Sequence, residues 1–173
     1  MKKLNCVIWF AICLVPLVSS SQTKVAVEKE RAAIKAVLEE EKKGYFDKNF
    51  EMMAATWVQK PSSVKMFMSQ EGERDMFGWE KISEGDRKAI SEDRSGYKNI
   101  QVEFSDFQFN IYESNAWAIF KAKWNWMYKD TPRKLEQTRI MAFEKVEGNW
   151  KITLMAIYNV PAAKKDAQKK TEK

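Results

Sequence analysis

The chain has 173 residues, of which 45% are apolar, 13% aromatic and 31% charged, and its net charge is +6. This composition is typical of one soluble domain with a packed core, and it excludes collagen, a coiled-coil rod and a wholly disordered chain. The sequence contains no histidine, and its two cysteines are Cys6 and Cys13. Catalysis by Ser-His or Cys-His pairs and the usual zinc sites are therefore excluded after residue 21.

Residues 1–21 predict a secretory signal peptide. Lys2 and Lys3 precede an apolar run from Cys6 to Val18, and serines at 19–21 supply the small residues that a signal peptidase needs. The run is shorter than the ~20 residues that a membrane-spanning helix requires. We therefore expect an exported protein, periplasmic or secreted, with no stable membrane insertion after cleavage.

The positive charge is concentrated at the end of the chain. Residues 163–173 hold five lysines against Asp166 and Glu172, and we expect this tail to be disordered. A nucleic-acid-binding protein would carry its basic excess on a folded surface, so no nucleic-acid partner is expected. No repeat or linker divides residues 22–162, which we interpret as a single domain.

Apolar periodicity predicts three helices. From Val25 to Lys43, apolar residues recur at steps of three and four, and Gly44 is expected to end this helix. Asn49 is a favourable N-cap for a short second helix. The third helix is expected over roughly Trp79 to Glu92.

Alternating patterns predict a sheet in the remaining sequence. An odd step between Phe104 and Phe107 predicts a β-bulge at Ser105-Asp106, which would keep both apolar sets on one face. Turns are expected at Thr131-Pro132 and at Glu147-Gly148-Asn149. Helices followed by an antiparallel meander indicate an α+β fold. The expected strands are Val64 to Ser69, Met76 to Trp79, Ile100 to Ile111, Asn115 to Lys129, Leu135 to Val146 and Trp150 to Val160.

Three segments form a pattern that is recognisable by its order and spacing. They are Ala32 to Leu38 followed by Tyr45 to Glu51, then Gly78 to Ile82, and last Phe143 to Ile152 with its Gly-x-Trp-x-Ile ending. Together they resemble the opening helix pair, the start of the third helix and the closing hairpin of the nuclear transport factor 2-like superfamily, particularly its SnoaL-like bacterial branch. The resemblance covers nearly all of residues 22–162.

The resemblance implies a cone, in which a strongly curved antiparallel sheet wraps around a long N-terminal helix and leaves an apolar pocket at the open end. It also implies a homodimer through the outer face of the sheet, where Trp117, Ile119 and Met127 are expected. Members include isomerases, dehydratases, polyketide cyclases and non-catalytic modules, so the fold does not fix the function. Many members carry histidines on the last strand at positions that are Leu154 and Ala156 here, and no catalytic residue is carried over.

Six residues are candidates for lining a ligand pocket. The three from positions 124–128 share one face near the end of a long strand, where the mouth of a cone would lie. Aromatic faces with polar groups suit apolar or sugar-like ligands. The alternative is an aromatic core that closes the cone around the first helix. The candidates are Tyr45, Trp124, Trp126, Tyr128, Arg139 and Tyr158.

Three functions remain open. The first is an exported, non-catalytic module that binds a small apolar or aromatic ligand, without a metal or cofactor. The second is an isomerase- or dehydratase-like enzyme that uses a carboxylate and a tyrosine, for which Asp106, Glu136 and Arg139 are candidates by position, although a solvated strand residue is the favoured interpretation of each. The third is a structural dimerisation module whose cone is filled by Phe120, Trp124 and Trp126.

Overall fold

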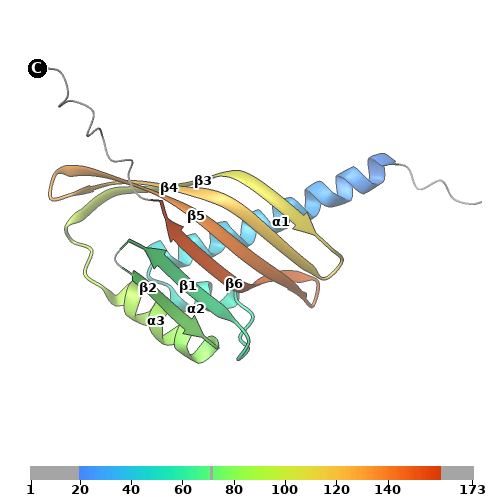
Figure 1. Ribbon diagram of the computed structural model, residues 1–173, viewed down its shortest axis with the longest axis horizontal. Coiled ribbons are helices and arrows are strands. Elements are labelled where there is room, and N and C mark those ends of the chain that lie inside the picture. Colours follow the sequence, from blue (N-terminus) through green and yellow to red (C-terminus); the bar gives the residue numbers. More distant parts are fainter. Residues whose placement is uncertain (1–19, 71, 161–173) are drawn as a thin grey trace, which may run out of the picture.

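The computed structural model describes residues 20–70 and 72–160. Within them, six strands form one sheet in the order β2-β1-β6-β5-β4-β3. Figure 1 shows α1 running along one face of this sheet, with α2 and α3 at the end where β1 and β2 lie. The elements are α1 (Ser20–Phe46), α2 (Phe50–Ala55), β1 (Val64–Ser69), β2 (Gly72–Phe77), α3 (Trp79–Ser91), β3 (Tyr97–Ile111), β4 (Asn115–Tyr128), β5 (Thr131–Val146) and β6 (Asn149–Asn159). The predicted α+β class is confirmed.

The core lies between α1 and the inner face of the sheet. Ile34 and Leu38 are buried one helical turn apart on the stripe that faces the strands. On β4, the inward positions include Ala116, Ala118 and Ala122, all of them buried. Because these side chains are small, the helix can pack closely against the middle of the sheet.

α1 continues past Gly44, where the sequence predicted its end, and stops at Phe46. A Cβ atom at Gly44 would lie 2.8 Å from both the backbone N and the Cγ of Met53. The glycine therefore permits the close approach of α2, and it does not terminate the helix. The predicted N-cap is confirmed, because Asn49 Oδ1 accepts a hydrogen bond of 3.0 Å from the backbone N–H of Met52.

Glu30 fixes the N-terminal half of α1 to the sheet. Its carboxylate accepts hydrogen bonds from Lys145 Nζ at 2.8 Å and from Trp150 Nε1 at 2.6 Å. These two bonds lower the pKa of Glu30 below its usual value. The contact joins the first helix to the closing hairpin, and it holds the helix in place along the sheet.

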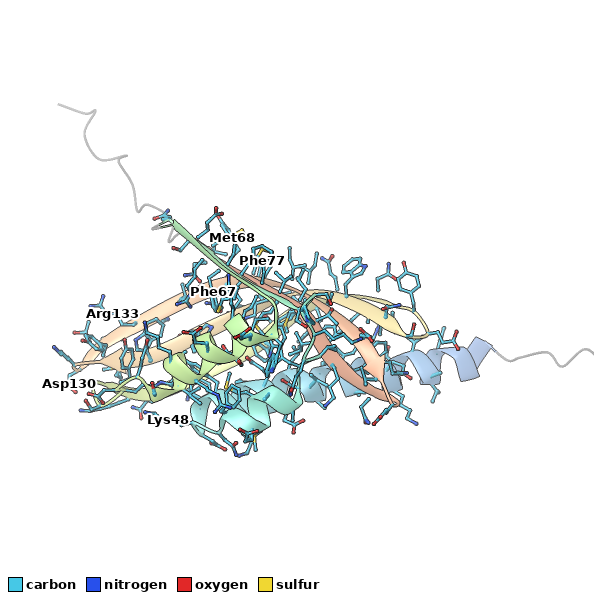
Figure 2. The ribbon with its side chains drawn as sticks, turned by 90° about the horizontal axis from the view of Figure 1, so that it is seen from below. Lys48, Phe67, Met68, Phe77, Asp130 and Arg133 are labelled. Carbon is cyan, nitrogen blue, oxygen red and sulfur yellow. The ribbon has the colours of Figure 1, made fainter. Side chains whose placement is uncertain are left out.

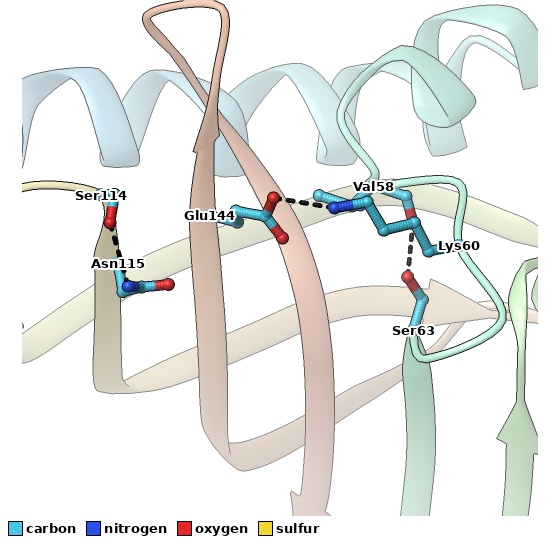
Figure 3. A network of polar contacts seen from close by, with 6 residues as sticks. All are labelled: Val58, Lys60, Ser63, Ser114, Asn115 and Glu144. Carbon is cyan, nitrogen blue, oxygen red and sulfur yellow. Dashed lines mark hydrogen bonds and ion pairs between the residues drawn. The ribbon is translucent and has the colours of Figure 1, made fainter.

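The loop between α2 and β1 is fixed by polar contacts that Figure 3 shows. Ser63 donates a hydrogen bond to the carbonyl of Val58, which closes the loop on itself. Lys60 Nζ contacts Glu144 Oε1 on β5 at 2.8 Å. The loop thereby places the start of β1 beside the final strands of the sheet.

The sheet contains one parallel pair among antiparallel ones. β1 pairs in parallel with β6 and antiparallel with β2. β4 to β6 form the predicted antiparallel meander, and β3 extends it by pairing antiparallel with β4. The register between β3 and β4 shifts between Ser105 and Gln108, which confirms the predicted bulge. A second irregularity lies between β5 and β6, where Ala142 pairs with Leu154 and Phe143 with Ile152. Thr153 is therefore an additional residue on β6.

The outer face of the sheet exposes large apolar side chains. Trp117 is 39% exposed, Ile140 44% and Tyr158 43%. Figure 2 labels Phe67 and Met68, which are neighbours on β1 and so lie on opposite faces of the sheet. The homodimer expected through the outer face stays a prediction.

Several predicted boundaries were wrong by a few residues. The turn between β4 and β5 is Lys129-Asp130, whose φ angles are 45° and 62°, while Thr131 and Pro132 already pair with β4. A two-residue turn with positive φ at both positions matches the twist of the flanking strands. β2 begins at Gly72, before the predicted start at Met76.

Two predictions concern the termini of the chain. The tail at 163–173 lies outside the described residues, as does the signal peptide except for its last two positions, so export stays a prediction. Within the part of the chain that the structure describes, no helix is both long and apolar enough to cross a membrane.

Candidate functional site

A cavity of about 730 Å³ opens between the second half of α1, α3 and the inner face of the sheet. This volume is in the range of small-molecule sites. The lining is mixed, and this differs from the apolar pocket that the sequence predicted. Its charged residues are Glu41, Lys42, Lys65, Arg74, Lys81, Glu84, Asp86, Lys88, Glu92 and Arg139; its apolar and aromatic residues include Phe46, Phe67, Met76, Val102, Phe104, Trp124, Met155 and Ile157.

Glu41 enters the cavity from α1 because it continues the buried stripe of that helix. Ile34, Leu38, Glu41 and Tyr45 follow one another at steps of four, three and four residues, so all four lie on one face. Glu41 is only 7% exposed, and its side chain makes no hydrogen bond or ion pair with the described residues. Burial raises the pKa of its carboxyl group, and nearby Lys65 only partly opposes this effect.

Lys65 and Asp86 form a buried ion pair that links β1 to α3. Lys65 Nζ lies 2.5 Å from Asp86 Oδ1, and both side chains are 6% exposed. Strand alternation turns Lys65 and Phe67 toward the cavity, and Asp86 lies on the same helix face as the buried Ile82 and Ile90. Each of the two buried charges in the cavity wall is therefore neutralised by the other.

Arg139 comes from β5 and is held by Gln137, its inward neighbour on the same strand. The Nε and Nη2 groups of Arg139 donate hydrogen bonds to Gln137 Oε1 at 3.2 and 3.0 Å. Trp124 Nε1 donates to the same oxygen at 2.9 Å, and Gln137 Nε2 donates to Asn159 Oδ1. Arg139 is 7% exposed and forms no ion pair with a described residue. Burial lowers the pKa of its guanidinium, which Glu41 opposes, and arginine stays protonated in proteins.

Tyr45 lies one helical turn beyond Glu41 and also lines the cavity. Burial raises the pKa of its phenol above the usual value, and the positive charge of Arg94 opposes this rise. The Arg94 guanidinium lies 4.0 Å from the centre of the Tyr45 ring and donates a hydrogen bond to the Tyr45 carbonyl. The phenol is thus neutral near pH 7 and able to donate a proton in a hydrogen bond.

The structure brings together three of the six residues predicted for a pocket, namely Tyr45, Trp124 and Arg139. Trp126 and Tyr128 share the strand face of Trp124 but lie closer to the hairpin, and neither is among the described residues that line the cavity. Tyr128 packs against the ring of Tyr97 at 5.0 Å between ring centres. Tyr158 lies on the outer face of the sheet, so its placement in the pocket was wrong.

The residues considered as catalytic carboxylates lie outside the cavity. Asp106 is exposed at the bulge of β3, with a φ of 57°. Glu136 forms an ion pair of 3.2 Å with Lys121 and is 43% exposed. On the last strand, Met155 and Ile157 line the cavity, whereas Leu154 and Ala156, which the resemblance pointed to, do not. The inward positions are nevertheless apolar, and they cannot transfer a proton.

Sequence reasoning missed Glu41, Lys65, Asp86 and Gln137. A signal for Glu41 existed, because it occupies the helical step that follows Ile34 and Leu38. A signal for Gln137 also existed, since it shares strand parity with Arg139. Asp86 and Lys65 gave none, because a charged residue on a short helix or on a strand is usually solvated.

The cavity bears on one further expectation. The alternative of a filled cone does not hold, since Phe120 is buried deeper in the core and Trp124 lines an open volume of about 730 Å³. Among the described residues, no group of three His, Cys, Asp or Glu side chains could hold a metal ion.

No family model matches the sequence, and no curated protein matches it either. Solved structures resemble it in architecture. A candidate scytalone dehydratase from Novosphingobium aromaticivorans has a TM-score of 0.64 at 13% identity, with 82% of this chain and 89% of that chain covered. A candidate dehydratase from the NTF2-like family of Streptomyces avermitilis has a TM-score of 0.61 at 10% identity, covering 78% and 99%.

A third structure, a nuclear transport factor 2-like protein of unknown function from Shewanella oneidensis, has a TM-score of 0.53 at 14% identity, covering 75% of this chain and 98% of that chain. Identities this low carry information about architecture alone. The chain therefore has the nuclear transport factor 2-like fold that its sequence predicted.

Proposed function

We propose that this protein binds a small organic molecule in the cavity between α1, α3 and the sheet. The observation that carries the proposal is the pair of buried charges, Glu41 and Arg139, that face the cavity without an ion-pair partner among the described residues. The hydrophobic core is formed by other side chains, among them Ile34 and Leu38 on α1 and Phe120 on β4.

The cost of burying these groups supports a role in binding. An ionised side chain loses several kcal/mol on leaving water, and only good pairing offsets that loss. Lys65 and Asp86 are paired in this way, whereas Glu41 and Arg139 are not. A bound molecule that pairs with them would offset the cost, and the aromatic wall beside them would hold its apolar part.

The proposal is tested by screening organic acids, amides, alcohols and ketones for a rise in the melting temperature of the protein. A ligand at a hundred times its Kd stabilises the folded state by about 2.7 kcal/mol, which a thermal scan detects easily. We expect the ligands found to lose this effect in E41Q or R139M, and to retain it in E40Q and R133M, whose parent residues are exposed. Ligands that stabilise all four variants equally would place binding elsewhere.

A second candidate function is acid–base catalysis of the isomerase or dehydratase type. It is favoured by Glu41 and Tyr45, which line one cavity a helical turn apart, because the raised pKa of Glu41 suits a group that must exchange a proton near neutral pH. Two of the structurally similar proteins are named as candidate dehydratases. This candidate replaces the carboxylates at 106 and 136 with Glu41.

Turnover of cyclic β-hydroxyketones and enones would test the catalytic candidate. We expect E41Q to lose roughly a hundredfold or more in kcat, the contribution typical of a general acid or base. E40Q is the matched control on the same helix and should keep the wild-type rate. A panel that is bound but not converted would leave the protein a binding module.

A further inference from the structure

Arg139 has hydrogen-bond donors for which no described residue supplies an acceptor. A guanidinium carries five N–H groups, and here Nε and Nη2 each donate one to Gln137 Oε1. That oxygen also accepts from Trp124 Nε1, so its capacity is filled. Nη1 donates to no described residue. The second N–H of Nη2 is likewise without an acceptor, and the two nitrogens together present the edge that binds a carboxylate in bidentate fashion.

The charges around Arg139 leave one positive charge uncompensated. Lys65 and Asp86 neutralise each other at 2.5 Å. Glu41 is the remaining buried acid of the cavity; burial raises the pKa of its carboxyl group, and it forms no ion pair with Arg139. Among the described residues that line the cavity, Arg139 is therefore the buried cation that has no ion-pair partner, and the carboxylate of a ligand can take that place.

Aromatic rings flank the same guanidinium. Arg139 Cζ lies 5.5 Å from the centre of the Phe104 ring and 5.8 Å from that of Trp124. The Trp124 ring lies 5.9 Å from that of Phe46, which adds a third aromatic surface. A ligand group that pairs with Arg139 thus has planar apolar surfaces directly beside it.

We propose that the cavity binds a monocarboxylic acid attached to a planar ring, with the carboxylate on Arg139 and the ring beside Phe104 and Trp124. The proposal rests on the proposed function and deepens it by naming the class of ligand. Gln137 acts as a positioning residue, because its oxygen holds two of the guanidinium nitrogens and fixes the direction of the others.

The test compares three probes that carry the same naphthalene ring: naphthoate, naphthamide and naphthyl phosphate. Binding is measured by isothermal titration calorimetry and by tryptophan fluorescence, to which Trp124 contributes. We expect naphthoate to bind the wild-type protein roughly tenfold to a hundredfold more tightly than naphthamide, the ratio that one charge-assisted contact supplies. We also expect naphthoate to bind more tightly than the phosphate.

Variants locate the contact. R139M should lose the preference for naphthoate over naphthamide, while R139K should keep a weaker preference because it retains the charge without the planar fork. R133M is the matched control on the same strand, since Arg133 is exposed near the β4–β5 hairpin in Figure 2. The comparison of probes on the wild-type protein does not depend on the folding of any variant.

Each result decides between the inferences. Equal affinity for naphthoate and naphthamide would overturn the assignment of a carboxylate and leave the proposed binding function standing. Tighter binding of the phosphate would likewise overturn the assignment of a carboxylate. A preference for naphthoate that persists in R139M would remove Arg139 from the contact. Failure of every probe, together with an empty ligand screen, would count against both proposals.

Discussion

D86N is expected to destabilise the folded protein by about 3–5 kcal/mol, the largest single effect that the structure predicts. Asp86 neutralises Lys65 at 2.5 Å, and both side chains are almost fully buried. Asparagine has nearly the same shape but no charge, so it leaves the Lys65 ammonium buried without its counter-ion. Urea denaturation followed by tryptophan fluorescence measures the loss as a lower midpoint at an unchanged slope.

Two comparisons separate this effect from a general loss of packing. The double variant K65M/D86L removes both charges together, and we expect it to recover most of the stability, because a well-packed apolar pair often replaces a buried ion pair at little cost. D130N breaks the exposed pair of Asp130 with Lys98 and should cost less than about 1 kcal/mol. A double variant as unstable as D86N would show that lost shape, and not the stranded ammonium, causes the instability.

The architecture was predictable because its signals are local. The phase slip at Ser105-Asp106 appears directly in the alternation of apolar residues, and the structure has its register shift there. The Asn49 cap is also a local signal, since an amide at that position can bind the first free N–H groups of α2. The parallel pairing of β1 with β6 brings together segments about 90 residues apart, and no neighbouring residues specify it.

The site was predictable only in part, because counting alternate residues along a strand gives the wrong face after a β-bulge that the sequence does not reveal. Counting from Trp150 by twos predicts that Leu154 and Ala156 face inward. The additional residue at Thr153 reverses that order, so Met155 and Ile157 line the cavity. After Thr153 the strand is apolar on both faces, from Leu154 to Ile157, so its residues do not indicate which face points inward.

The charged lining was missed for a different reason. Most charged residues are exposed to solvent, so a charged residue in the sequence is expected at the surface. This expectation is wrong where the fold keeps a cavity that charged side chains line. Glu41 is the informative exception, because it interrupts an otherwise apolar helical stripe at a position where Ile34 and Leu38 require burial. A charged residue at a core position of a long, strongly periodic helix is therefore a better indicator of a site than an aromatic cluster.

E41Q is expected to stabilise the protein near neutral pH by about 1 kcal/mol or more, because glutamine has nearly the same shape but cannot ionise, and one pKa unit corresponds to about 1.4 kcal/mol. Burial is the largest influence on this carboxyl group, and it outweighs the attraction of Lys65 and Arg139, so the pKa in the folded state is raised above the usual 4.5. The folded protein then binds the Glu41 proton more tightly than the unfolded chain does. Stability is lost as the pH rises from about 4.5 through the folded-state pKa, because ionisation is easier in the unfolded chain.

The pH profile distinguishes this mechanism from a change in packing. The charged and titratable groups that act on Glu41 are Lys65 from β1, Asp86 from α3, Arg139 from β5 and Tyr45 from α1. Melting temperatures of wild type and E41Q should converge below pH 4.5 and separate by several degrees as the pH rises. E40Q on the same helix should show no such divergence. A difference in melting temperature that is the same at every pH would contradict the raised pKa. If E41Q gains stability and also loses ligand binding, the burial of Glu41 serves function at the expense of stability.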